Sequence, residues 1–198
     1  MSASSDLHPA QHRALRELIA MATQLSRHWR ALAERLPDGD IVKAFRSGAD
    51  SADQLMTEIT PAARAHGLSV GPAAESAGRV LAGLRGNVRD RALERNQAAR
   101  LASLDAQHVT TLLRYLHELS DANGPPDLAA LCGVWDKRFT RVESSARRAA
   151  AALGHDPESA IEPLDQSALG RAGQRLGSTI GGIGEASDRV LGLRRRNG

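Results

Sequence analysis

The pattern of hydrophobic and polar positions predicts four long amphipathic helices. In the first of them, apolar residues recur at three- and four-residue steps, the spacing that places side chains on one face of an α-helix. We expect Ser5 or Asp6 to cap this helix and the turn at residues 37–40 to end it. Its inner face comprises Leu15, Leu18, Ile19, Ala22, Leu25, Trp29, Leu32 and Leu36.

The second predicted helix begins near Asp40 and ends at Gly67. Pro61 interrupts its pattern, so we expect the helix either to kink there or to restart with Thr60 as its cap. The turn between the first two helices is very short, which predicts that they lie antiparallel. The residues expected on the inner face are Ile41, Phe45, Ala49, Ala52, Leu55, Met56 and Ile59.

The longest helical pattern lies between Arg91 and Leu119. The turn at residues 121–126 ends this third helix, and Pro126 or Asp127 opens the fourth, which stops at Gly154. We expect one stripe of the third helix to face the core, formed by Leu101, Leu104, His108, Leu112, Tyr115 and Leu119. The expected core residues of the fourth are Leu128, Leu131, Trp135, Phe139, Val142, Ala146, Ala149 and Leu153.

The two predicted hairpins are joined by a glycine-broken segment, residues 68–90, which we interpret as a crossover with a short helix. Two antiparallel hairpins with one long crossover have the connection of ferritin-like bundles. The sequence therefore predicts an all-α chain with an up-down four-helix bundle at residues 1–154. A linker at 155–166, which contains Pro157 and Pro163, and an accessory helix at 167–198 follow.

The predicted C-terminal helix has two interleaved patterns. Leucine, isoleucine or valine recurs every seven residues from Leu169 to Val190, and three glycines stand four residues apart. Glycines at this spacing form a groove that another helix can approach closely. The sequence leaves open docking on the chain's own bundle, self-association, or contact with a membrane surface. The residues of this interaction face are Gly173, Leu176, Gly177, Gly181 and Ile183.

Composition narrows the function classes. Only 3% of the residues are aromatic, which favours helices over strands, and the single cysteine, Cys132, excludes a disulfide framework. The net charge of +3 is scattered among acidic residues, unlike the basic face of a nucleic-acid-binding protein. The sequence has neither a signal-peptide pattern nor a run of eighteen apolar residues, so we expect a cytoplasmic protein without a spanning helix.

Residues 10–154 resemble the small bacterial ferritin-like proteins of unknown function, a group often associated with stress responses. The resemblance is carried by an apolar pair, aromatic residues, acidic residues and a terminal glycine at matching intervals in the first hairpin, and by the glycine-rich segment between Gly71 and Gly86. It implies a ferritin-like fold and a stress-associated role. The matching residues of the hairpin are Leu18, Ile19, Trp29, Glu34, Phe45, Glu58 and Gly67.

The ligand set of ferritin-like di-iron proteins is largely missing from this sequence. Such sites use a glutamate from each of two helices and a Glu-x-x-His pair from each of the others, and no Glu-x-x-His occurs here. Asp105 and His108 are the only carboxylate and imidazole at ligand spacing on a predicted core face, and Glu17 and His28 would add to them if they faced His108.

Motifs for other chemistry are also missing, since the chain has neither a Gly-x-Ser-x-Gly elbow nor a Walker sequence. We therefore predict a non-catalytic protein without a cofactor that acts through self-association or a protein partner. The alternative is an iron-binding ferritin-like oxidase, or one that uses another divalent metal, with Asp105 and His108 as ligands.

Overall fold

The computed structural model describes residues 7–68 and 93–165. These residues form four long helices, α1 (Pro9–Ala33), α2 (Asp40–Ala65), α4 (Arg95–Asn123) and α5 (Pro126–Ala152). A 3₁₀ turn, η3 (Leu153–His155), and a short helix, α6 (Pro157–Ala160), follow α5. The prediction of an all-α chain is confirmed: β-pairing within the described residues is limited to an isolated bridge between Glu94 and Pro163.

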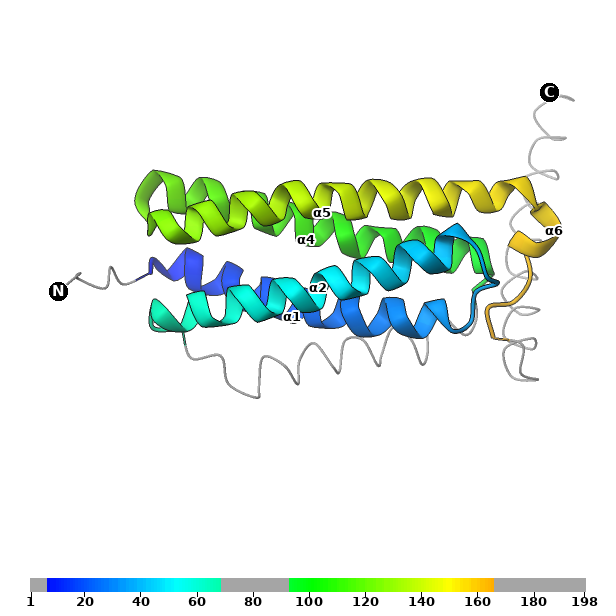
Figure 1. Ribbon diagram of the computed structural model, residues 1–198, viewed down its shortest axis with the longest axis horizontal. Helices are drawn as coiled ribbons and strands as arrows, with labels where there is room; N and C mark the ends of the chain where they lie inside the picture. Colours follow the sequence, from blue (N-terminus) through cyan, green and yellow to red (C-terminus); the bar gives the residue numbers. More distant parts are fainter. Residues whose placement is uncertain (1–6, 69–92, 166–198) are drawn as a thin grey trace, which may run out of the picture.

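The four long helices pack side by side as two pairs, α1 with α2 and α4 with α5 (Figure 1). Gln11 near the start of α1 contacts Ser120 near the end of α4, whereas Trp29 near the end of α1 contacts Ala102 near the start of α4. These two helices are therefore antiparallel. Because α1 is also antiparallel to α2, helices α2 and α4 run in the same direction (Figure 1). The crossover predicted at residues 68–90 lies outside the described residues except for Leu68.

The start of α1 differs from the prediction, because His8 caps the helix instead of Ser5 or Asp6. The Nδ1 atom of His8 accepts a hydrogen bond from the backbone of Ala10, and the Gln11 side chain accepts one from the backbone of His8. Pro9 occupies the first helical position, where its lack of an N–H costs nothing because that N–H has no partner within a helix. The position of the proline therefore fixes where the helix begins.

Helix α2 continues through Pro61 to Ala65, so the predicted restart at Thr60 is wrong. The predicted end at Gly67 is confirmed by a Schellman motif, in which a glycine adopts the left-handed conformation just beyond the helix. Gly67 has φ of +81°, its N–H donates to the carbonyl of Arg64, and the N–H of Leu68 donates to that of Ala63. Leu68 is buried and anchors this end of the hairpin.

The core contains two aromatic pairs, one in each hairpin. The rings of Trp29 and Phe45 lie 4.7 Å apart, and those of Trp135 and Phe139 lie 6.2 Å apart. All four side chains are nearly or fully inaccessible to solvent. The expected inner face of α1 is confirmed as buried throughout, from Leu15 to Leu36.

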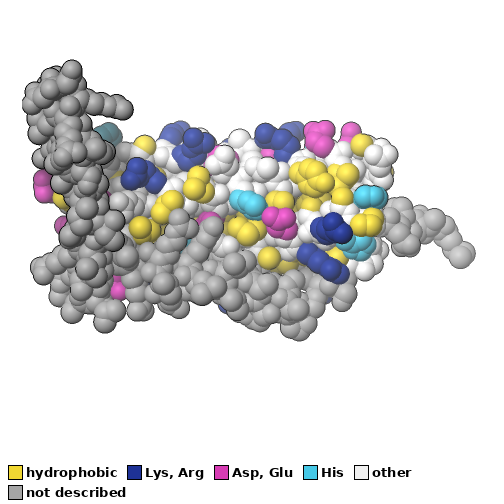
Figure 2. Space-filling view, turned by 180° about the vertical axis from the view of Figure 1, so that it is seen from behind, with side chains coloured by type: hydrophobic (Ala, Val, Ile, Leu, Met, Phe, Trp, Pro, Cys, Tyr) yellow, Lys and Arg dark blue, Asp and Glu magenta, His cyan; other side chains and the backbone are white. Residues whose placement is uncertain are grey.

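The predicted core stripe of α4 is wrong for most of its residues, because Leu112 is its only buried member. Leu104 is 55% exposed and Tyr115 49% exposed, and His108 also lies at the surface. Small residues form most of the buried face of α4, and they let α1 and α5 approach closely. Hydrophobic side chains are accordingly visible at the molecular surface (Figure 2). The buried face consists of Ala98, Ala99, Ala102, Ser103, Asp105, Ala106, Val109, Thr110, Leu112, Leu113, Leu116 and Ser120.

Residues 155–165, the described part of the linker predicted at 155–166, are packed against the start of α4. The backbone N–H of Arg95 donates to the carbonyl of Glu162, and the N–H of Leu164 donates to the carbonyl of Leu93. The Arg95 guanidinium also forms an ion pair of 2.7 Å with the Glu162 carboxylate. Leu164 is buried, so this segment closes one end of the core.

Candidate functional site

The carboxylate of Asp105, one of the two predicted metal ligands, lies inside the protein. Its Oδ2 atom is 2.9 Å from Nδ1 of His28 on α1, and both side chains are nearly inaccessible to solvent. Gln24, one turn before His28, donates a long hydrogen bond of 3.5 Å to Oδ1 of Asp105. Helices α1 and α4 therefore share a buried polar cluster composed of Gln24, His28 and Asp105.

The contact between His28 and Asp105 pairs a hydrogen-bond donor with an acceptor. A carboxylate can only accept hydrogen bonds, so an ionised Asp105 requires that Nδ1 of His28 carries a proton. Removing two polar groups from water is costly, and their mutual hydrogen bond offsets much of that cost. The cluster thus holds α1 and α4 in one register, because sliding either helix would leave a buried charge without its partner.

His108, the other predicted ligand, lies at the protein surface. Its Nε2 atom is 2.9 Å from Oε1 of Glu17 on α1, and both side chains are about half exposed. Glu17 and His28 were predicted to act as additional donors if they faced His108. The structure brings Glu17 to His108 but brings His28 to Asp105, so that two separate carboxylate–imidazole pairs join the same two helices.

The predicted ligands do not gather at one point. Within residues 7–68 and 93–165, no three histidine, cysteine, aspartate or glutamate side chains are grouped so that they could hold a metal ion. The arrangement supplies one imidazole and one carboxylate at each of two places. A metal centred on Asp105 and His108 therefore stays a prediction that needs donors beyond these pairs.

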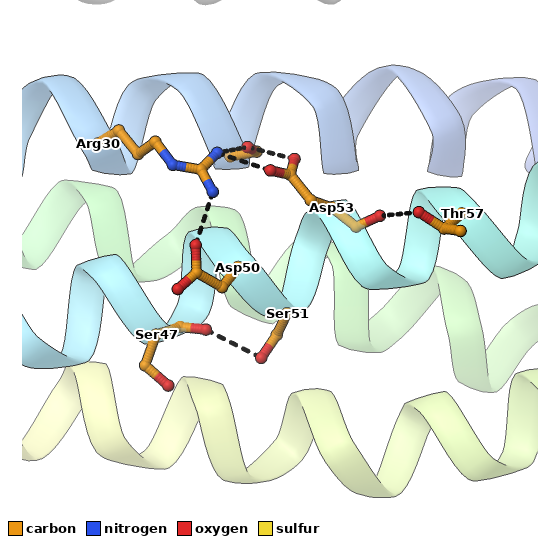
Figure 3. A network of polar contacts seen from close by, with 7 residues as sticks. Arg30, Ser47, Asp50, Ser51, Asp53 and Thr57 are labelled. Carbon is orange, nitrogen blue, oxygen red and sulfur yellow. Dashed lines mark hydrogen bonds and ion pairs between the residues drawn. The ribbon is translucent and has the colours of Figure 1, made fainter.

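Asp50 and Asp53, two acidic residues of α2, lie at the surface. Arg30 on α1 binds Asp50 at 2.6 Å and Asp53 at 2.8 Å, as Figure 3 shows, and all three side chains are well exposed. Ser26 donates a hydrogen bond of 2.6 Å to Asp53. Burial acts to lower the pKa of Arg30, but the hydrogen bonds and charges of Asp50 and Asp53 outweigh it and raise the pKa. This network joins α1 to α2 at the surface.

Cys132 is a free thiol in the core and is fully buried. Burial raises the pKa of this thiol to about 12, because the charged thiolate is disfavoured away from water. The thiolate, not the thiol, is the nucleophile and metal ligand. Cys132 is therefore suited to packing and not to catalysis.

The pairing of His28 with Asp105 was not predicted from the sequence. The signal was present in α1, where Gln24 and His28 stand four residues apart and next to the core residues Leu25 and Trp29. Polar residues at such positions have to find buried partners.

The described residues include no helix that is both long and apolar enough to cross a membrane. Comparison of the chain with models of known protein families, with curated proteins and with solved structures gives no match.

Proposed function

We propose that this chain is a non-catalytic, ferritin-like helical bundle that acts by binding another protein or a second copy of itself. The directions of the helices support the fold part of this proposal. Helices α1 and α2 form one antiparallel pair, α4 and α5 form another, and α2 and α4 run in the same direction (Figure 1). Ferritin-like bundles combine two such hairpins through one long crossover. The stress-associated role implied by the sequence resemblance belongs to the same proposal.

The observation that carries the non-catalytic part is how the ionisable side chains between the helices are used. His28 binds Asp105 and Glu17 binds His108, both between α1 and α4, while Asp50 and Asp53 bind Arg30 at the surface. Each of these contacts joins two helices. A di-iron site requires the carboxylates of four helices to converge on one point. The side chains support a scaffold with fixed helix register better than they support such a centre.

Mass and metal content of the full-length chain, purified without chelator, test this proposal together. We expect a mass above that of the 21.1 kDa monomer or co-purification of one partner at fixed stoichiometry, with less than one tenth of an equivalent of iron, manganese or zinc. Deletion of residues 167–198 should reduce the assembly to monomers if the predicted glycine face mediates it, and that face lies outside the described residues. A strictly monomeric protein without a partner would refute the proposal.

A specific observation favours a second function, metal binding with a reduced ligand set. Asp105 and His108 stand three residues apart on α4, and each already contacts a second potential ligand from α1, namely His28 or Glu17. Binding of Fe²⁺, Mn²⁺ or Zn²⁺ with one equivalent per chain would support this function if Asp105→Asn and His108→Ala both abolished it. Asp50→Asn, at the α1–α2 surface, is the matched control and should leave such binding unchanged.

A further inference from the structure

The outer surface between α4 and α5 contains a cavity that the contacts described above do not explain. Its volume is about 290 Å³, close to the lower limit of small-molecule sites, which span roughly 300–1,000 Å³. Small residues at the helix–helix contact create the space, since neither Ser103 nor Ala150 fills it. The lining residues are Arg100, Ser103, Leu104, Gln107, Arg147, Ala150 and Ala151.

The cavity combines an apolar wall with positive charge. Leu104 is 55% exposed, and its side chain faces the cavity beside two alanines of α5. Arg100 on α4 and Arg147 on α5 stand on the two sides. An exposed leucine next to arginines is unfavourable in water but suits a ligand that has both an apolar body and an anionic group.

The two arginines differ in how their charges are balanced. Arg100 donates hydrogen bonds only to the side-chain and backbone oxygens of Asn96, which are neutral, and it has no acidic partner among the described residues. Arg147 contacts Glu143 on its own helix at 3.1 Å, and the Arg147 side chain is 65% exposed. A guanidinium group presents paired N–H donors that match a carboxylate. Arg100 is thus the better placed of the two to bind an anion.

A second cavity continues the first along the same two helices. Its volume is about 490 Å³, and it shares Gln107 with the first. Tyr115, which is 49% exposed, lines the far part, and Arg114 there is already neutralised by Asp136. Along α4, Leu104 and Tyr115 are separated by about 16 Å, given a rise of 1.5 Å per residue. Three threonines and Glu143 also line the second cavity. We refer to the two adjoining cavities together as the groove, and its unbalanced positive charge stands at the Arg100 end.

We propose that this groove, from Arg100 to Tyr115, binds a single-chain amphiphilic carboxylate such as a medium-chain fatty acid. The carboxylate binds at Arg100 and Arg147, and the hydrocarbon chain lies over Leu104 and extends toward Tyr115. When the hydrocarbon chain of the ligand binds, it is removed from water together with the exposed side chains of Leu104 and Tyr115.

Calorimetric titration of the full-length protein with dodecanoate, below its micelle concentration, tests the proposal. We expect one site per chain. In the series octanoate, decanoate, dodecanoate, the affinity should rise about fourfold for each buried methylene group. Dodecyltrimethylammonium, which has the same chain and a positive head group, should not bind there. Acetate should not bind measurably, because it lacks the chain.

Four variants, one of them a control, separate a specific site from adsorption to the surface. Arg100→Gln and Arg147→Gln should each weaken dodecanoate binding about tenfold. Arg141→Gln is the matched control, because Arg141 is an exposed arginine of α5 that does not line the groove, and it should bind as the unmodified protein does. Ala151→Leu adds an exposed side chain that fills the first cavity, and it should abolish binding while circular dichroism shows an unchanged fold.

Several results would overturn the proposal. These are no binding of dodecanoate, equal binding of the cationic amphiphile, several weak sites per chain, or equal affinity in Arg100→Gln, Arg147→Gln and Arg141→Gln. An Ala151→Leu protein that folds and binds dodecanoate with full affinity would likewise exclude the cavity as the site.

Discussion

A β-carbon placed on Gly48 would lie 2.2 Å from Cζ3 of Trp29. The indole ring of Trp29 therefore lies directly against the backbone of α2, and only glycine leaves room for it. Trp29 is fully buried and donates a hydrogen bond from Nε1 to the carbonyl of Ala102, so it joins α1 to both neighbouring helices. The distance between α1 and α2 depends on this contact.

We expect Gly48→Ala to destabilise the protein. Alanine favours a helix over glycine by about 1 kcal/mol, but overpacking a filled core costs about 1–3 kcal/mol. Trp29 lies between the backbone of α2 at Gly48 and the carbonyl of Ala102 on α4, so its ring cannot easily move away. The steric cost should therefore exceed the gain in helix propensity. Urea unfolding should show a net loss of up to about 2 kcal/mol.

Gly133→Ala, in the interior of α5, is the matched control for Gly48→Ala. The added carbon there would lie 3.2 Å from the ring of His117, which is only partly buried and has to shift by a few tenths of an ångström. This substitution should cost clearly less stability than Gly48→Ala. Equal stability of the two variants would contradict the role assigned to the contact between Gly48 and Trp29.

The two carboxylate–imidazole pairs between α1 and α4 should differ in their energetic weight. Asp105→Ala leaves a buried imidazole N–H of His28 without its acceptor, and leaving a buried polar group unsatisfied costs about 1–3 kcal/mol. Glu17→Ala removes one partner of a half-exposed pair, which contributes about 0–1 kcal/mol. Urea midpoints of the two variants, measured at pH 7, provide the comparison. Similar losses in both would show that burial does not decide the strength of these contacts.

The pair between His66 and Asp127 predicts a dependence of stability on pH. Nε2 of His66 lies 3.1 Å from Oδ2 of Asp127. Desolvation acts to raise the pKa of Asp127. Hydrogen bonds from His66 and the backbone, together with the charge of His66, act in the opposite direction. They outweigh desolvation, so the pKa of Asp127 lies below its ordinary value of 3.8. A carboxylate whose pKa is lower in the folded protein than in the unfolded chain stabilises the fold at pH values above the pKa of the unfolded chain. This contribution is lost as the pH falls through the pKa of the folded protein.

Asp127→Asn should therefore be less stable than the unmodified protein above about pH 4, and the difference should shrink as the pH falls below 3.8. Urea unfolding at pH 6, 5, 4 and 3 measures this difference. Asp121→Asn, an exposed position at the end of α4 with no ion pair among the described residues, is the control and should show a smaller effect. A difference that grows on acidification would contradict the assigned direction of the pKa shift.

Cys132 should react with thiol reagents only after the protein unfolds. Its thiol is fully buried, and burial raises its pKa to about 12. At pH 8 we expect no reaction with dithionitrobenzoate in native buffer and one equivalent of reaction in denaturing urea. Rapid stoichiometric reaction of the native protein would show that the core around α5 opens easily.

The stripes of α1 and α2 could be predicted because large apolar residues dominate their buried faces. In α1, Leu18, Leu25 and Trp29 leave one possible inner side, and the sequence at Gly67 identifies the end of α2. The stripe of α4 was predicted wrongly for the same reason. Leu104 and Tyr115 outweigh the alanines of the opposite side in hydrophobicity, although the alanines are what allows the helices to approach each other.

The sequence by itself determined the helical class, the approximate extents of the four long helices and the inner faces of α1, α2 and α5, because these follow from local spacing and from prolines and glycines at the helix ends. Only the tertiary structure decided which side of α4 is buried, that Asp105 binds His28 while His108 binds Glu17, and that residues 155–165 pack on the start of α4. Each of these depends on which helix lies opposite and how closely it approaches. Spacing along one helix carries no information about the residue that faces it from another.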